Sequence, residues 1–181
     1  MFYLSQELFF PPVSETKSHG IVALGGDLSS ERLQLAYKSG IFPWFEDGEP
    51  ITWWSPDPRM ILFLDELVVS KSMRNVLNRN MIEAYCKLNE LGIAKSVEVW
   101  QNNELVAGLY GIDLGHVFCG ESMFSKVSNA SKVAFITLVK HLQQNDYKLL
   151  DCQVYNPHLE SLGCREIDRI DFMELLKKDQ L

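Results

Sequence analysis

Three strand-forming segments follow one another in the second half of the chain, separated only by short turns. They cover residues 96–100, 104–110 and 116–121, and the turns between them contain Asn102-Asn103 and Asp113-Leu114-Gly115. Turns this short join antiparallel neighbours, so we expect the three segments to form one antiparallel meander. This local pairing constrains the fold more strongly than any other feature of the sequence.

A helix and a further strand follow the meander. The helix is expected over residues 129–143, where apolar residues recur at helical spacing, and the strand over residues 148–154. A meander, a crossover helix and another strand are the order found in the acetyltransferase superfamily called GNAT. This order predicts a protein of mixed helices and strands, α/β in the broad sense and α+β within it. Its sheet should be mixed and mainly antiparallel.

Two of these strands end in polar side chains. Glu121 and Ser122 follow one apolar run, and Asp151 and Gln153 lie in the other. A buried carboxylate must be matched by donors or by a charged partner, so two of them at the ends of apolar strands indicate a site. Ordinary structural hydrogen bonds at the strand ends are the alternative.

Composition excludes several classes of protein. The chain of 181 residues is 46% hydrophobic and 23% charged, which is the balance of a soluble globular protein with a core. A net charge of −7 argues against an extended nucleic-acid surface, so no DNA partner is expected and any RNA contact should be local. No apolar run approaches membrane-spanning length, and the start lacks the pattern of a signal peptide. We therefore expect a cytoplasmic protein without membrane contact.

The four cysteines and four histidines are scattered along the chain. They form no CxxC pair and no HxxxH or HExxH spacing, although zinc sites need clustered ligands. We expect no metal site and no cofactor, and we expect reduced thiols that pack as small apolar groups.

An aromatic segment covers residues 40–59. It holds three of the four tryptophans together with four prolines, so regular secondary structure is not expected there. Aromatic faces in a stiff loop can stack on a nucleobase, and Trp44 is the candidate for this role. For Trp53 and Trp54 we expect burial against the core.

A basic patch is expected on a helix that Ser70 caps. Lys71, Arg74 and Arg79 lie together on its outer side in an otherwise acidic protein. These cations are candidates for contacting phosphates, and a solvated helix face is the alternative.

The residues at the start of the crossover helix indicate whether acetyl-coenzyme A could be the acyl donor of a GNAT-like enzyme. A GNAT enzyme holds the pyrophosphate of acetyl-coenzyme A on a glycine-rich loop at that place. Residues 125–132 contain no glycine here, although Lys126 and Lys132 are present. An acyl-coenzyme A donor is therefore disfavoured.

Five runs of the sequence resemble leucyl/phenylalanyl-tRNA:protein transferase, in matching order through nearly the whole chain. They are Ala23 to Leu28, Gly40 to Phe45, Trp53 to Arg59, Phe118 to Ser125 and Asp151 to Val154. The resemblance implies a small N-terminal domain over residues 1–62 and a GNAT-like catalytic domain over residues 63–181. It also implies transfer of Leu, Phe or sometimes Met from the 3′ end of aminoacyl-tRNA to the N-terminal Arg or Lys of a protein. The modified protein is thereby marked for degradation by the N-degron route.

The resemblance assigns Asp151 and Gln153 to the reacting centre. A glutamine amide is too weakly basic to take a proton, so we interpret Gln153 as an acceptor that orients the attacking amine, with Asp151 holding that array. Glu121 is the expected counter-charge for the cationic N-terminal residue, and a structural salt bridge is its alternative role.

An apolar pocket is expected beside these groups. Its candidate lining residues come from strands that meet there and are Leu109, Phe118, Met123 and Leu150. The Met123 thioether adapts to both Leu and Phe side chains. By resemblance, Trp44 would stack on the terminal adenine, and Lys71, Arg74 and Arg79 would meet phosphates of the tRNA acceptor stem.

The sequence departs from the family at one point. Relatives carry a longer segment where Asn80 adjoins Met81 in this chain. Two other functions stay open: a GNAT-type acyl-coenzyme A N-acyltransferase, and a non-catalytic binder of basic protein N-termini. Such a binder would need Glu121 and the pocket, but not Asp151 and Gln153.

Overall fold

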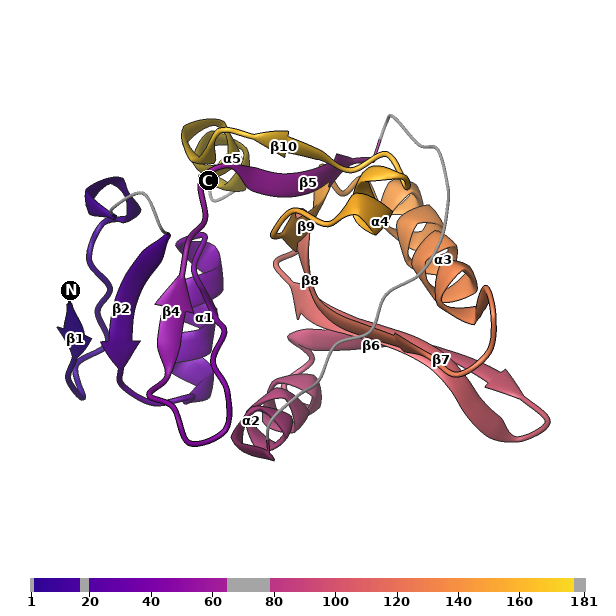
Figure 1. Cartoon of the computed structure of the whole chain (residues 1–181), viewed down its shortest axis with the longest axis horizontal. Coiled ribbons are helices and arrows are strands. Elements are labelled where there is room, and N and C mark those ends of the chain that lie inside the picture. Colours follow the sequence, from indigo (N-terminus) through magenta and orange to yellow (C-terminus); the bar gives the residue numbers. More distant parts are fainter. Residues whose placement is uncertain (1, 17–19, 65–78, 178–181) are drawn as a thin grey trace. The chain divides into compact units, whose positions relative to one another are not determined.

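The computed structural model describes residues 2–16, 20–64 and 79–177, which divide into two compact units (Figure 1). The first unit combines Met1–Arg59, Leu77–Glu90 and Ile167–Leu181, and the second combines Met60–Val76 and Leu91–Glu166. Helices and mixed sheets occur together, which confirms the predicted α+β class. The predicted domain boundary after residue 62 stays a prediction.

The sheet of the first unit has the strand order β1-β2-β4-β3. Its strands are β1 (Tyr3–Leu4), β2 (Ile21–Gly25), β3 (Phe42–Pro43) and β4 (Thr52–Trp54). The expectation that residues 40–59 lack regular structure is wrong, because Trp53 pairs with Ala23 of β2 on one side and with Pro43 of β3 on the other. Pro43 is tolerated because β3 is an edge strand, where a missing N–H costs no ladder bond.

The described part of the first unit also contains three helices and one short 3-10 turn. They are η1 (Val13–Glu15), α1 (Ser30–Lys38), α2 (Arg79–Glu90) and α5 (Arg169–Lys177). Arg59 is buried between two aromatic rings, with its guanidinium carbon 4.9 Å from the Phe42 centroid and 4.6 Å from the Phe172 centroid. It also donates to the carbonyl of Gly40 at 3.3 Å. Arg59 thus links the end of α1 to α5.

The sheet of the second unit has the strand order β10-β5-β9-β8-β7-β6. Its strands are β5 (Arg59–Phe63), β6 (Ala94–Gln101), β7 (Glu104–Asp113), β8 (Val117–Ser125), β9 (Leu149–Gln153) and β10 (Arg165–Ile167). Strands β6, β7 and β8 form the predicted antiparallel meander. Strand β9 then adds to β8 in the parallel direction, while β5 adds to β9 in the antiparallel direction.

Among its described residues, the second unit contains two helices, α3 (Ala130–Gln144) and α4 (Pro157–Glu160). α3 packs on one face of the meander (Figure 1), and its buried residues Phe135, Leu138 and Leu142 join the hydrophobic core of this unit. Asn156 caps α4 through its side chain, which accepts the backbone N–H of His158 at 2.9 Å. The core therefore supports β8 and β9 from the helix side.

Candidate active site

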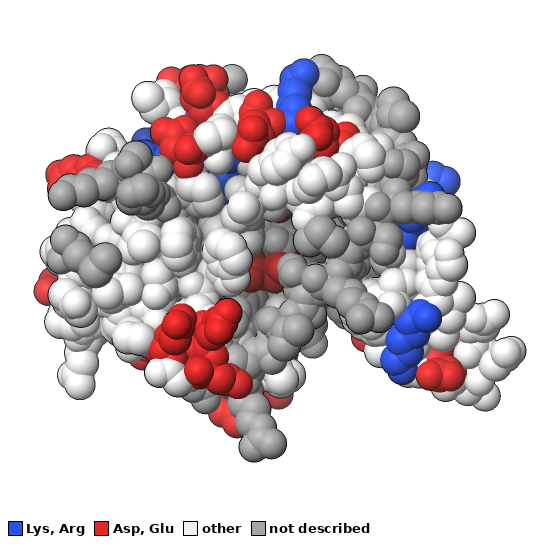
Figure 2. Space-filling model, in the orientation of Figure 1, with Lys and Arg blue, Asp and Glu red and all other residues white. Residues whose placement is uncertain are grey.

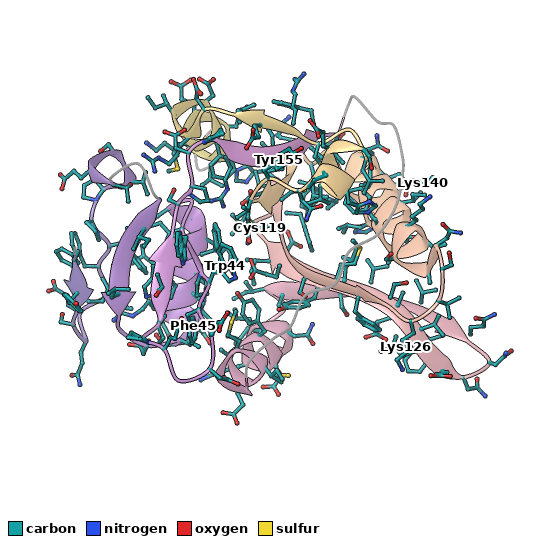
Figure 3. All side chains as sticks on the ribbon, viewed as in Figure 1. Trp44, Phe45, Cys119, Lys126, Lys140 and Tyr155 are labelled. Carbon is teal, nitrogen blue, oxygen red and sulfur yellow. The ribbon has the colours of Figure 1, made fainter. Side chains whose placement is uncertain are left out.

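Strands β8 and β9 separate at the point where their polar residues begin. Their parallel pairing runs through Phe118 with Leu150 and ends at Cys119 with Asp151; Cys119 is labelled in Figure 3. Glu121 and Gln153 each lie two residues beyond this last pair. The ends of two diverging strands thus present their side chains toward a shared place.

A β-bulge in β8 sets the direction of the Glu121 side chain. Tyr110 of β7 pairs with Ser122 and the next residue, Gly111, pairs with Gly120, so Glu121 is the additional residue of the bulge in β8. A bulge of this kind bends the strand and redirects one side chain. Sequence alternation alone does not reveal the extra residue.

A second irregularity lies at the matching place in β9. Met60 of β5 pairs with Gln153 and Ile61 pairs with Asp151, which leaves Cys152 as the additional residue. Gln153 then adopts the left-handed backbone region, with φ of 65°. A non-glycine residue there is uncommon, and such residues cluster at functional sites.

Three predicted catalytic residues are brought together by hydrogen bonds. The side-chain amide nitrogen of Gln153 donates to Oε1 of Glu121. The backbone N–H of Gln153 donates to Oδ1 of Asp151 at 3.0 Å, and Asp151 is fully buried. Asp151 therefore holds the strained turn that places the Gln153 amide against Glu121.

Tyr110 lies beside Glu121, a neighbour that the sequence reasoning missed. Its side chain is mostly buried, and burial, together with the negative charge of Glu121, raises the pKa of its hydroxyl well above the usual range. The signal in the sequence was a tyrosine placed beside Leu109 in an otherwise apolar strand. Its nearness to Glu121 depends on the bulge.

The predicted pocket residues belong to one hydrophobic cluster. Leu109, Phe118 and Leu150 are buried, and the partly buried Met123 packs against the same cluster. Helix α3 contributes Phe135 to it. The sequence placed that residue on the apolar side of a helix, but it did not connect that side with the strands.

Trp44 lies in the first unit, just after β3, where Figure 3 labels it beside Phe45. Its side chain is 57% exposed, and its ring centroid lies 5.6 Å from that of Trp54. Trp54 holds the loop by donating its indole N–H to the carbonyl of Trp44 at 2.8 Å. Trp53 is fully buried, as expected, whereas Trp54 is only partly buried. An exposed aromatic ring is thus held in place by a second one.

The predicted basic patch falls mostly outside the described residues. Lys71 and Arg74 lie there entirely; Arg79 begins α2, but its side chain is outside the described part. The face of the molecule in Figure 2 shows several groups of acidic side chains and few basic ones. This distribution agrees with the net charge of −7.

The described part of the chain carries neither a cluster of metal-ligating side chains nor a membrane-spanning helix. Among its described residues, no three His, Cys, Asp or Glu side chains are grouped so that they could hold a metal ion. None of its described helices is both long enough and apolar enough to cross a bilayer.

Comparison with known proteins identifies the family. The family model described as leucyl/phenylalanyl-tRNA protein transferase matches residues 70–177, and the model of that family's N-terminal domain matches residues 26–57. A leucyl/phenylalanyl-tRNA–protein transferase of Flavobacterium johnsoniae is 62% identical over 210 aligned positions, covering 98% of this chain and 99% of the relative. The transferase of Flavobacterium psychrophilum is 56% identical, covering 98% and 100%. That of Christiangramia forsetii is 47% identical, covering 97% and 100%.

The length of these alignments is itself informative. An alignment of 210 positions exceeds the 181 residues of this chain, so the relative carries residues that this chain lacks. This agrees with the longer segment expected in relatives, whose location between Asn80 and Met81 stays a prediction. The extent and identity of the matches show that the chain belongs to the leucyl/phenylalanyl-tRNA–protein transferase family.

Proposed function

We propose that this protein transfers Leu, Phe or Met from the 3′ end of aminoacyl-tRNA to the N-terminal Arg or Lys of an acceptor protein. The observation that carries the proposal is the contact between the Gln153 amide and Glu121, with Asp151 holding the backbone of Gln153. The relatives carry leucyl/phenylalanyl-tRNA and protein in their names. The polar side chains at the ends of β8 and β9 (Glu121, Asp151 and Gln153) suit a reaction between an ester and an amine.

The reaction exchanges an ester for an amide. The acceptor's α-amino nitrogen attacks the carbonyl carbon of the aminoacyl ester, the bond from that carbon to the ribose oxygen breaks, and a proton passes from nitrogen to the ribose oxygen. An α-amino group has a pKa of about 7.7 to 8.0, so a useful neutral fraction exists without a strong base. Holding the two reactants in alignment can lower the barrier by roughly 7 to 11 kcal/mol.

Gln153 orients the attacking amine. A glutamine side chain has donors at its nitrogen and an acceptor at its oxygen. Its nitrogen donates to Glu121, so its carbonyl oxygen is turned to accept a hydrogen bond from the amine. The left-handed backbone at Gln153, fixed by Asp151, sets the direction of that acceptor.

The two carboxylates stabilise positive charge. The amine nitrogen becomes cationic as the new bond forms, and a buried carboxylate acts strongly on it because little water screens the interaction. Asp151 is fully buried and supplies this charge, while Glu121 also faces the cationic side chain of an N-terminal Arg or Lys. A carboxylate paired with Arg forms a charge-assisted hydrogen bond, which favours basic acceptors.

The apolar cluster beside Glu121 receives the donor's side chain. Leu109, Phe118 and Leu150 provide its buried walls, and the partly buried Met123 is the adaptable member. A flexible thioether accommodates both a branched and a flat side chain. Trp44 stacks on the terminal adenine, and Lys71, Arg74 and Arg79 meet acceptor-stem phosphates.

The first turn of α3 weighs against acetyl-coenzyme A as the donor. A pyrophosphate site there needs outward-facing N–H groups. The N–H of Ala130 donates instead to the Val127 carbonyl at 3.2 Å, that of Ser131 donates to Ser125 Oγ at 3.3 Å, and that of Lys132 donates to a carbonyl at 3.1 Å. This turn uses those donors internally.

Substitution of Asp151 tests the reaction. Asp151→Asn retains an oxygen that can accept the Gln153 N–H but removes the charge, whereas Asp151→Ala removes both. We expect Asp151→Ala to lower the rate of radiolabelled Leu transfer from Leu-tRNA to an Arg-initiated peptide by about 100-fold, and Asp151→Asn to lower it less. Binding of the charged tRNA should be nearly unchanged in both variants.

Asp113 offers a matched control in the same unit. Its carboxylate accepts hydrogen bonds from the Tyr147 hydroxyl at 2.6 Å and the Gly115 N–H at 2.8 Å, so Asp113→Ala also removes a structural acceptor. Its transfer rate should stay near that of the unaltered protein. Equal losses of transfer and of tRNA binding in Asp151→Ala would remove the mechanistic role. Unaltered protein that binds basic N-termini without transferring Leu would support a non-catalytic binder.

The product determines the biological outcome. An acceptor that gains an N-terminal Leu or Phe exposes a large apolar first residue, which marks the protein for degradation by the N-degron route. The reaction takes place in the cytoplasm, where charged tRNA is available.

A further inference from the structure

Cys152 and Cys164 form a close thiol pair beside the proposed reacting centre. Their sulfur atoms lie 3.6 Å apart, and both side chains are reduced. Cys152 belongs to β9, and Cys164 lies just before β10. The chain between the two residues returns through α4, so the tertiary fold, not the turn of a single element, brings the sulfurs together.

The two thiols differ in access. Cys164 is buried in the core of the second unit, with 3% of its surface exposed, whereas Cys152 is only partly buried. Cys152 is therefore the more accessible of the two thiols to a small oxidant, and Cys164 lies beside it as the second thiol. A reactive cysteine beside a resolving cysteine is the usual arrangement of a redox-sensitive pair.

The position of Cys152 in the backbone connects the pair to the site. It is the additional residue of the bulge in β9, between Asp151 and Gln153. The Cys152 carbonyl also accepts the backbone N–H of Val154 at 2.8 Å, in a tight turn centred on Gln153. A pull on the Cys152 side chain acts on the peptide links to both neighbours.

We propose that Cys152 and Cys164 are an oxidation site, at which a peroxide converts the two thiols to a disulfide. The Cys152 thiolate attacks one peroxide oxygen, the O–O bond breaks, and the products are a Cys152 sulfenic acid and one water or alcohol. The Cys164 thiolate then attacks the Cys152 sulfur, the S–S bond forms, the S–O bond breaks, and hydroxide leaves as water with the proton from Cys164. The two thiols supply two electrons and the peroxide accepts them.

Disulfide formation displaces Gln153, a consequence that rests on the function proposed above. A disulfide bond is about 2 Å long, so the sulfurs must approach by about 1.5 Å. This movement distorts the bulge, and the Gln153 amide loses its alignment with Glu121. A misplacement of about 1 Å in a reacting array costs about 100-fold in rate, so oxidised protein should transfer Leu about 100-fold more slowly, and a thiol reductant should restore the rate.

The experiment follows the covalent change and the activity separately. The full chain is treated with hydrogen peroxide, then divided for peptide mapping by mass spectrometry and for the transfer assay, before and after dithiothreitol. We expect a linked peptide pair, lighter by two hydrogen atoms, that contains Cys152 and Cys164. Its amount should rise in step with the loss of transfer, and both changes should reverse on reduction.

Two variants separate the pair from other thiols. Cys164→Ala removes the resolving thiol from the core. This variant should retain transfer in the reduced state, form no such disulfide, and lose far less transfer to peroxide than the unaltered protein. Cys86→Ala removes an exposed thiol of α2 in the first unit and should behave like the unaltered protein.

Three results would overturn the inference: no disulfide between these residues, a disulfide that leaves the transfer rate unchanged, or Cys164→Ala protein that loses transfer to peroxide to the same extent as the unaltered protein. If reduced, unaltered protein transfers no Leu, the proposed function fails instead, while the mass measurement still tests the oxidation site. If Cys164→Ala does not fold, the parallel time courses of linkage and activity in the unaltered protein decide the matter.

Discussion

Gly111 and Gly120 face each other across β7 and β8, and only one of them has room for a side chain. A Cβ on Gly111 would lie 2.2 Å from the carbonyl oxygen of Cys119 and 2.4 Å from a ring carbon of Phe118, although real Cβ atoms essentially never approach closer than 3.0 Å. A Cβ on Gly120 would meet its nearest atom, the carbonyl oxygen of Asp151, at an ordinary 3.5 Å. The bulge at Glu121 starts at this close pair of strands.

The two alanine variants should therefore differ in stability. Forcing a group into a packed interior costs about 1 to 3 kcal/mol, and two severe contacts, one of them with the backbone, place Gly111→Ala at about 3 kcal/mol of destabilisation. Gly120→Ala meets no such contact and restricts the unfolded chain, which stabilises by about 0.4 to 1 kcal/mol where the native backbone suits alanine. We expect a difference of about 3 to 4 kcal/mol between the variants.

Urea unfolding followed by circular dichroism measures this difference. With a slope of about 2 kcal/mol per molar urea, the midpoint for Gly111→Ala should fall by about 1.5 M, while that for Gly120→Ala should stay within about 0.5 M of the unaltered protein. Equal midpoints for the two variants would refute the argument that close strand approach at Gly111 supports the bulge. A large fall for Gly120→Ala would refute it as well.

Three further predictions address the site and the pH dependence of stability. Glu121→Gln should reduce transfer to Arg-initiated peptides far more than to Ala-initiated ones, because it removes the negative charge; an unchanged preference in competition assays would exclude this role. Trp44→Ala should weaken binding of charged tRNA by about 10-fold if the ring stacks on a base, whereas Trp100→Ala, which removes a ring that is also 57% exposed, should not; equal effects in a filter-binding assay would contradict stacking. Burial and the charge of Lys132 lower the pKa of His158 from 6.5, so the folded state prefers the neutral ring and its stability should fall as the pH drops below about 6.5. Urea midpoints measured from pH 7.5 to about pH 5 should flatten in His158→Gln, and a profile identical to that of the unaltered protein would contradict this assignment.

Local patterns were enough to predict the elements that carry the site. Short turns identified the meander of β6, β7 and β8, helical spacing identified α3, and apolar runs with polar ends identified β8 and β9. Each of these signals depends on residues close together in the chain, such as the Asn102-Asn103 turn with its left-handed backbone. The small sheet of the first unit was missed because β1, β3 and β4 are only two or three residues long, too short to show alternation.

The sequence by itself determined the family, the α+β class and the residue types available for the chemistry. The tertiary structure decided how those residues meet: the bulge that turns Glu121 toward Gln153, the buried Asp151 that fixes the Gln153 backbone, the nearness of Tyr110 to Glu121, and the contact of Cys152 with Cys164. Strand register and the approach of distant segments depend on packing across the whole sheet and core. A one-residue change of register turns every following side chain to the other face, and only the packed structure specifies where that change occurs.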